Sequence, residues 1–524
     1  MARSRRGLGI DMPKPTVGVG GYRRPPRQRN PLALIVTILV IGALVGSAGW
    51  VFLRRANPDD RVPLVVLGVA GSDGQLRRLA GAVVTGPEGQ TTTADEDGAL
   101  TLSFTPPASL EVAAPGYETG VFRVTTVPPG GPIGLQLEPV VLAGRVADAE
   151  GNGISALVQA GGEEIATDDV GAFELVAALP GPIGATKPAW LPATKEWDGT
   201  PGIFEIVMEP FVARGVRVYG PTAGSTAGFT RLLEMVEDTT INTLVFDTKE
   251  ETGAVLYNSQ VADARDTGAV SNTYETEVVL AAAKERGYYT ITRIVTFQDG
   301  FWAPANPEHA ARNTETGGVW LNHRGLAWAD PTDREAWEYP LALAVEACRL
   351  GFDEVQFDYV RFPSDGDLTV LGYDQPVDEE LRVATISAFL AEAREQLHAE
   401  GCAVSADVFA IILSFPNDQG LGQRLEEASG SVDFLSPMIY PSHYSPGWLG
   451  FEDPNAHPSE VVGQALEAGM PRLQGAILRP WLQAFYYDAA QIAEEIAQAE
   501  RYGLGWILWN ATSQFEAGWF PTTE

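Results

Sequence analysis

The chain has 524 residues, of which 45% are hydrophobic and 20% charged, so it is long enough for about two to four globular domains with sizeable cores. Its formal net charge is −32, and because the first 55 residues carry ten Lys/Arg against one Asp, the residues after Arg55 carry −41. Such an acidic body argues against nucleic acid and anionic membrane surfaces as its main ligands.

The N-terminal part of the chain has the pattern of a membrane anchor. Residues 1–31 are rich in Gly, Pro and Arg, which predicts a disordered cytoplasmic tail. Residues 32–53 are 22 consecutive residues without a charge, enough to cross a hydrocarbon core of roughly 30 Å as a helix. The basic residues before this segment hold the N-terminus in the cytoplasm and send the body outside the cell. The alternative is a cleaved signal peptide with a weak cleavage site at Ser47; we expect an uncleaved anchor in the cell membrane.

An internal repeat divides residues 62–210 into two copies, 62–139 and 140–210. The clearest match aligns TTADEDGALTL with ATDDVGAFEL, whose glycines, Gly98 and Gly171, are 73 residues apart. Both copies alternate short β-branched runs with Gly, Pro and Asp turns. This pattern predicts two small β-sandwich modules.

The turn Asp95–Gly98 carries a resemblance. It is similar to the D-x-D-G turn of the carboxypeptidase regulatory-like family of β-sandwich modules, which implies that the two copies are spacer or adhesion units. The carboxylates of Asp95 and Asp97 would also suit Ca²⁺. A hairpin turn that favours Asp and Gly explains them more simply, so we expect no metal there.

Alternating strands and helices fill residues 213–524. Eight apolar strand candidates occur, at 215–220, 241–249, 288–297, 354–362, 403–410, 432–440, 473–481 and 505–510. Helical patterns separate them, at 226–238, 275–286, 334–350, 378–400, 459–469 and 488–502. Because no Gly-rich phosphate loop follows any strand, eight β/α units predict a (β/α)₈ TIM barrel rather than a doubly wound sheet.

Only two cysteines are present, Cys348 and Cys402, which excludes a disulfide-stapled scaffold or a cysteine-rich metal site. They fall at the end of a predicted helix and at the start of a predicted strand in neighbouring units. This placement allows one bridge, but we expect two buried free thiols.

The active site of a TIM barrel is built where its strands end, so polar and aromatic residues there are the candidates. A carboxylate at the end of a buried strand is expensive to hold, which makes Asp358 the first candidate for chemistry. The alternative is an Asp that caps the next loop or pairs with Arg361. The candidate residues are Asp247, Lys249, Arg293, Asp358, Arg361, Asp407, Tyr440, His443, Arg479, Trp481 and Trp509.

This mixture of carboxyl groups and aromatic rings suits sugar chemistry. A glycosidase needs one protonated and one ionised carboxyl group across the scissile bond, and aromatic faces that stack on the sugar. Asp358 and Asp407 lie on adjacent predicted strands and are the expected pair, with Asp247 as the alternative partner. Because side chains alternate along a strand, Asp247 and Lys249 are predicted to share a face. No nucleophile elbow, Walker loop or zinc-ligand spacing occurs, and we expect neither a cofactor nor a metal.

Four sequence blocks carry a second resemblance: GFDEVQFDYVRFPSDG, DFLSPMIYPSHY, AILRPWLQAF and GWILWNA, with INTLVFDTKEETGAVLYNS ahead of them. They resemble the signature blocks of a bacterial glycoside hydrolase family, a barrel domain of formerly unknown function that is distantly similar to the α-amylase superfamily. The resemblance spans about residues 214–520. It implies a TIM barrel and a carbohydrate substrate.

The amylase-like arrangement implies a nucleophile on strand four, an acid on strand five and a stabilising carboxylate on strand seven. Asp358 matches the first position. Asp407 stands where a Glu acid would be expected, Arg479 stands in place of the carboxylate, and Gln356 replaces an Arg two residues before the nucleophile.

The sequence thus predicts a membrane-anchored extracellular glycoside hydrolase that acts on cell-wall or environmental polysaccharide. Asp358 is expected to be the nucleophile or base and Asp407 the acid. The residues expected to bind, orient or stack on the substrate are Lys249, Arg293, Arg361, Tyr440, His443, Arg479, Trp481 and Trp509. The alternative is a non-catalytic carbohydrate-binding or cell-surface structural protein. An open cleft with two acids roughly 5 to 10 Å apart would favour the enzyme.

Overall fold

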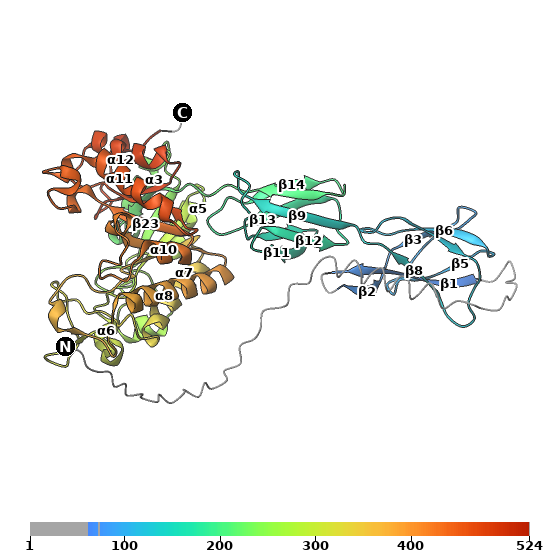
Figure 1. Cartoon of the computed structure of the whole chain (residues 1–524), viewed down its shortest axis with the longest axis horizontal. Helices are drawn as coiled ribbons and strands as arrows, with labels where there is room; N and C mark the ends of the chain where they lie inside the picture. The colour runs from blue at the N-terminus through green and yellow to red at the C-terminus, as the bar shows by residue number, and fades with distance from the viewer. Residues whose placement is uncertain (1–60, 72–73, 523–524) are drawn as a thin grey trace, which may run out of the picture. The chain divides into compact units, whose positions relative to one another are not determined.

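The computed structural model describes residues 61–71 and 74–522 (Figure 1). The predicted cytoplasmic tail (1–31) and membrane helix (32–53) lie outside these residues. Within the described part, no helix is both long enough and apolar enough to span a bilayer. The chain divides into two compact units, with the division after Pro139.

Two small sheets enclose one apolar core in the first unit. In one sheet, β1 (Arg61–Ala70) pairs antiparallel with β2 (Gln75–Arg78) and β5 (Ala99–Ser103), and parallel with β8 (Ile133–Leu137). The other sheet has the order β4 (Thr91–Thr93), β3 (Val83–Thr85), β6 (Ala108–Ala113) and β7 (Gly120–Val124). Burial alternates strictly along β6, as expected for a strand with one face on the core and one in solvent.

The same strand plan recurs at the start of the second unit. There β9 (Val141–Ala147) lies between antiparallel β12 (Ala172–Val176) and parallel β15 (Ile203–Val207), as β1 lies between β5 and β8. The partner sheet has the order β11 (Glu163–Ala166), β10 (Leu157–Ala160), β13 (Gly181–Thr186) and β14 (Ala193–Trp197). The internal repeat of the sequence is therefore visible as two copies of one arrangement.

Asp95 and Asp168, at equivalent places in the repeat, close the same turn. The Oδ1 atom of each accepts hydrogen bonds of 2.8–3.0 Å from the backbone N–H groups two and four residues later. Gly98 and Gly171 follow with φ of 64° and 77°, a conformation that residues with a side chain rarely adopt. The turn itself thus accounts for the Asp and Gly residues of this motif.

Eight parallel strands close into a barrel, which confirms the predicted fold. In order around the barrel they are β16 (Arg214–Val218), β17 (Thr243–Lys249), β18 (Tyr289–Val295), β20 (Glu354–Asp358), β22 (Ala403–Phe409), β23 (Phe434–Ile439), a split strand of β24 (Ile477–Leu478) and β25 (Trp481–Gln483), and β26 (Trp506–Trp509), which pairs with β16. Pro480 separates β24 from β25 because it has no N–H to donate. The second part of this split strand ends at Gln483, beyond the predicted end at 481.

Helices surround the barrel strands, in the part of Figure 1 coloured from light green to red. The six predicted patterns are α3 (Thr226–Val236), α5 (Thr276–Lys284), α7 (Glu338–Leu350), α8 (Glu379–Ala399), α11 (Pro458–Gly469) and α12 (Ala489–Arg501), and the structure adds α10 (Leu425–Ser431). Shorter elements lie in the loops: α2 (Gly220–Gly224), α4 (Ala262–Asp266), α6 (Trp302–Ala305), α9 (Ile411–Ser414), and the pair β19 (Arg312–Asn313) and β21 (Leu371–Gly372). Asp378 starts α8 by accepting from the Leu381 N–H at 2.9 Å, a typical N-cap.

Cys348 and Cys402 form a disulfide bond, so the expectation of two free thiols is wrong. Cys348 lies in the last turn of α7 and Cys402 immediately precedes β22. Their Cα atoms are 6.0 Å apart, a span that a disulfide bridges. Since α7 leads into β20 and β20 is the neighbour of β22, the barrel brings together two residues separated by 54 positions.

A bulge at Thr248 interrupts β17. Asp247 is in register with Arg293, whereas Lys249 is in register with the residue directly after Arg293, so β17 has one residue more than β18 here. The bulge breaks the alternation of side chains, and the prediction that Asp247 and Lys249 share a face is wrong. Asp247 contacts Arg293, whereas Lys249 pairs with Asp299 at 2.8 Å.

Candidate active site

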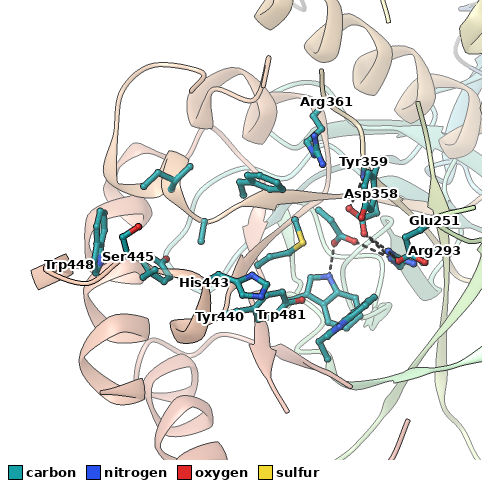
Figure 2. Close-up of a pocket in the computed structure, with 17 residues that line it drawn as sticks. Glu251, Arg293, Asp358, Tyr359, Arg361, Tyr440, His443, Ser445, Trp448 and Trp481 are labelled. Atoms are coloured by element: carbon teal, nitrogen blue, oxygen red, sulfur yellow. Dashed lines mark hydrogen bonds and ion pairs between the residues drawn. The ribbon is translucent and has the colours of Figure 1, made fainter. Parts of the chain in front are cut away.

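A cavity of about 590 Å³ lies where the barrel strands end. Six successive strands, or the residues that directly follow them, each place one predicted residue in its wall: Arg293, Asp358, Asp407, Tyr440, Trp481 and Trp509. Arg361 and His443 also line it. Figure 2 shows Asp358, Arg293 and Glu251 gathered on one side of this cavity and Trp448 on the other.

Asp358, the last residue of β20, is held by three hydrogen bonds. Its Oδ2 accepts from Arg293 Nε at 2.9 Å and from an Arg293 terminal nitrogen at 2.5 Å, and its Oδ1 accepts from the Tyr359 N–H at 2.7 Å. Tyr359 has a φ of 49°, an uncommon backbone conformation for a residue with a side chain. This turn brings the Tyr359 N–H onto the carboxylate and fixes the side chain at the cavity wall.

Arg293 is the centre of the charged cluster. Besides Asp358, its guanidinium contacts Asp247 at 2.9 Å and Glu251 at 2.6 Å, and its Nε lies 3.9 Å from Asp407 Oδ2. The side chain is 1% exposed, so these carboxylates replace the water that a charged group loses on burial.

Asp247 lies beside Arg293 and does not line the cavity. Arg217 of β16 donates to its two carboxylate oxygens at 2.5 and 3.3 Å, and Arg217 also donates to the Ala511 carbonyl at 2.6 Å. Both carboxylate oxygens of Asp247 are therefore occupied by guanidinium groups. Asp247 therefore contacts the two arginines and does not face the cavity, and its predicted catalytic role stays a prediction.

Asp407 is the buried acid of the site. Burial and the charge of Asp358 raise its pKa well above the ordinary value, and they outweigh the opposing effect of Arg293. Trp481 Nε1 donates to Asp407 Oδ1 at 2.7 Å, and among the described residues no group donates a hydrogen bond to Oδ2. The raised pKa favours the protonated form of Asp407 beside Asp358.

The spacing of the two carboxyl groups follows from their shared neighbour. Asp358 Oδ2 lies 2.9 Å and Asp407 Oδ2 lies 3.9 Å from Arg293 Nε, so these oxygens are separated by at most the sum of those distances, 6.8 Å. Retaining glycosidases hold their two carboxyl groups about 5–5.5 Å apart and inverting enzymes about 6.5–9.5 Å apart. For this one pair of oxygens, the upper limit of 6.8 Å is compatible with a retaining pair and with the short end of the inverting range.

Glu251 completes the cluster from the loop after β17. Burial raises its pKa, but the nearby Arg293 and Arg217 outweigh burial and lower the pKa to about 2. Two guanidinium groups, those of Arg217 and Arg293, thus face four carboxyl groups, those of Asp247, Glu251, Asp358 and Asp407. Burial, and then the charge of Asp358, explain why the pKa of Asp407 is raised.

Aromatic side chains form much of the remaining wall. The Trp509 ring lies 4.3 Å from the Arg217 guanidinium and 4.9 Å from that of Arg293, and it meets Trp481 edge-on at 5.3 Å. Tyr440 packs edge-on against His443, with ring centroids 5.2 Å apart. Burial lowers the pKa of His443 and raises that of Tyr440, so both rings are uncharged at neutral pH.

The structure does not bring Lys249 and Arg479 to the cavity, although both were predicted to bind substrate. The bulge turns Lys249 away, and its ammonium pairs with Asp299 and donates to the Val295 carbonyl at 2.7 Å. Arg479 lies inside the barrel and donates to both carboxylate oxygens of Glu354 at 2.5 and 3.0 Å. Glu354 is the first residue of β20, so this pair lies at the opposite end of that strand from Asp358.

Sequence reasoning missed Arg217 and Glu251. Arg217 lies within the apolar run of β16, and a charge inside a buried strand is itself a signal of an ion pair. Glu251 lies only two residues beyond Lys249, in the loop that follows β17, and such loops contribute residues to the active site of a TIM barrel. Among the described residues, no group of three or more His, Cys, Asp or Glu side chains is arranged to hold a metal ion.

A known family matches the barrel part of the chain. Residues 215–515 match the DUF4015 family, described as "Putative glycosyl hydrolase domain". No curated protein matches the chain. Among solved structures, a hypothetical protein from Ruminiclostridium thermocellum is 34% identical with a TM-score of 0.34, over 37% of this chain and 97% of its own.

Two solved glycosidases are also similar to this chain. Chitobiase from Flavobacterium johnsoniae is 14% identical with a TM-score of 0.37, over 59% of this chain and 46% of its own. An α-amylase from Lactobacillus plantarum is 14% identical with a TM-score of 0.39, over 57% and 71%. Because the family match covers more than half of the 524 residues, the chain belongs to the DUF4015 family.

Proposed function

We propose that the barrel hydrolyses glycosidic bonds with retention of configuration, with Asp358 as nucleophile and Asp407 as acid and base. One observation carries this proposal: a hydrogen-bonded carboxylate and a carboxylic acid of raised pKa share one cavity and one arginine. Opposite protonation states in two neighbouring carboxyl groups are what glycoside cleavage requires.

In the first step, Asp407 donates its proton to the glycosidic oxygen while Asp358 attacks the anomeric carbon, and the leaving sugar departs as an alcohol. In the second step, Asp407 takes a proton from water, the water oxygen attacks the anomeric carbon, and the bond to Asp358 breaks. Arg293 stabilises Asp358 as it becomes an anion again. Trp481 keeps the Asp407 carboxyl group oriented through both steps.

The proposed substrate is a polysaccharide of the cell wall or the environment. The apolar segment 32–53 would anchor the chain in the membrane with the barrel outside the cell, and residues 62–210 would act as a spacer. The cavity wall suits this substrate class because it combines aromatic rings with a few polar groups.

A second candidate is non-catalytic sugar binding. It is favoured by the observation that both oxygens of Asp358 already accept hydrogen bonds, since such bonds weaken a carboxylate as a nucleophile. The cavity and its aromatic rings would serve binding equally well. Hydrolysis of a bound saccharide would favour the enzyme, and binding without hydrolysis would favour the non-catalytic candidate.

The test uses the full chain against a panel of polysaccharides with reducing-end detection, followed by NMR of the first-formed anomer of any product. We expect release of sugar with retained configuration and loss of turnover in Asp358→Asn. Asp330→Asn is the matched control, because Asp330 is also buried but lies outside the cavity. Full activity of Asp358→Asn, or an inverted product, would contradict the assignment.

A further inference from the structure

One buried arginine of the cavity lacks a carboxylate partner. In the described part of the chain, four arginines are almost completely buried. Arg217 and Arg293 pair with carboxylates of the cluster and Arg479 pairs with Glu354. The fourth, Arg361, is 5% exposed and forms none of the ion pairs found among residues 61–71 and 74–522.

The guanidinium of Arg361 is fixed on one edge and open on the other. Its Nη1 donates to the Phe362 carbonyl and to Ser364 Oγ, both at 3.0 Å. Nε and Nη2 donate to no described protein group. Figure 2 shows the guanidinium end of Arg361 pointing into the space above Tyr440 and Trp481. The edge formed by Nε and Nη2 thus carries two parallel N–H donors without an acceptor among the described residues, on a side chain that lines the cavity.

Three aromatic rings pack around this guanidinium. The rings of Phe409, Tyr359 and Trp328 have their centroids 4.7, 4.9 and 5.0 Å from Arg361 Cζ. Cation–π contacts return part of the lost hydration but offer no hydrogen-bond acceptor. Burial lowers the pKa of Arg361 by more than Tyr359, Asp358 and Asp365 raise it.

We propose that Arg361 binds the carboxylate of an acidic sugar unit, a hexuronic acid, so that the substrate is an acidic polysaccharide; the assignment of the ligand as a saccharide rests on the proposed function. A carboxylate is planar and accepts two parallel N–H bonds from one edge of a guanidinium. It would also supply the counter-charge that Arg361 lacks. Arg361 is therefore a residue that determines specificity at the same cavity as Asp358.

The acidic body of the protein does not oppose this assignment at short range. Long-range repulsion between the body and an acidic polymer is screened within about 8–10 Å at physiological salt, whereas a buried pair is screened much less. Asp358 and Asp365 act on Arg361 through space, but neither lies within ion-pair distance. The open edge is thus available to a ligand.

The experiment measures binding without requiring turnover. Full-length protein is titrated with oligomers of glucuronate and of galacturonate, and with the same oligomers after reduction of their carboxyl groups to neutral alcohols. We expect at least one acidic oligomer to bind more tightly than its reduced counterpart. In Arg361→Gln this preference should fall on the order of 10- to 100-fold, the value of a charge-assisted hydrogen bond.

Two further variants separate recognition from structure. Arg361→Lys keeps the charge without the two-donor edge and should retain only part of the preference. Arg324→Gln removes the same charge from an exposed position and should leave the preference unchanged. If Arg361 served only packing, its replacement would weaken the binding of acidic and neutral oligomers equally. That result would overturn the proposal.

The outcome is distinguishable from that of the proposed function. Tight, Arg361-dependent binding of acidic oligomers without hydrolysis would sink the catalytic assignment and leave this inference standing. Hydrolysis of neutral polysaccharides, with no acidic oligomer preferred over its reduced form, would support the catalytic assignment and overturn the proposal for Arg361.

Discussion

Arg293 donates to Asp358 through both Nε and a terminal nitrogen, at 2.9 and 2.5 Å. The amylase-like resemblance implied an arginine in the same strand as the nucleophile, at the position of Gln356. Gln356 instead donates to Ser436 at 3.2 Å in the barrel interior. The neighbouring strand β18 therefore supplies the guanidinium that β20 lacks.

The proposed role of Asp407 as acid predicts a dependence on the leaving group. Asp407→Asn cannot donate a proton and should lower kcat/KM about 10²- to 10⁴-fold on a natural glycoside. On an aryl glycoside whose phenol is strongly acidic, the loss should be much smaller because departure needs little protonation. Kinetics over a series of aryl glycosides test this. An equal loss on all leaving groups would argue against the acid role.

Activity should fall as pH rises through the raised pKa of Asp407, because the acid is then deprotonated.

The contribution of Asp407 to stability should also fall as pH rises. A group whose pKa is raised on folding stabilises fully below its unfolded value, 3.8 for Asp, and loses this contribution as pH rises through the folded pKa. The unfolding free energy of Asp407→Asn relative to wild type should therefore increase with pH. A constant difference between pH 3 and pH 9 would contradict the shift.

The pKa of Glu251 is shifted in the opposite direction to that of Asp407, so its contribution to stability has the opposite pH dependence. Its folded pKa of about 2 lies below the unfolded value of 4.5, so its stabilisation is present above pH 4.5 and is lost as pH falls through 2. Glu251→Gln should cost about 2 kcal/mol at pH 7, and the cost should shrink at acid pH. Denaturant unfolding at pH 7 and pH 3 measures the change. A cost that is the same at both pH values is the contrary result.

Lys249 should matter for stability and not for substrate. Lys249→Met leaves Asp299 as an uncompensated buried charge and should cost about 3–5 kcal/mol. The matched control is Lys284→Met, whose pair with Asp353 is exposed and should be worth less than about 1 kcal/mol. We expect the KM of folded Lys249→Met to equal that of wild type. A raised KM with unchanged stability would restore the substrate role.

The Cys348–Cys402 bond should stabilise the barrel. It closes a loop of 54 residues, and its removal should cost about 2–4 kcal/mol. The double variant Cys348→Ala/Cys402→Ala should unfold at a lower denaturant concentration than wild type. A reducing agent should leave the unfolding midpoint of the variant unchanged. The same agent should lower the midpoint of wild type toward that of the variant. Two titratable thiols in the untreated, denatured protein would show that the bond is absent.

Apolar runs and turn residues sufficed to predict the eight strands, because a barrel strand is buried on both faces and stands out in composition. Asp358 and Asp407 were found because strand ends meet at one face of the barrel. The bulge at Thr248 was not predictable, since one inserted residue leaves no compositional trace. Arg479 was misplaced for a related reason: a pattern indicates which side chains face inward but not how deep they lie along the barrel axis.

The disulfide also makes a closed covalent ring of the segment that carries Asp358 and Arg361. The same ring contains residues 367–378 between β20 and α8, each of which is exposed or half-buried. A protease that cut one peptide bond in this stretch would leave both ends of the break attached to the same molecule. The ring therefore keeps the cavity-lining segment covalently joined to the barrel after a single cut, since neither fragment can diffuse away.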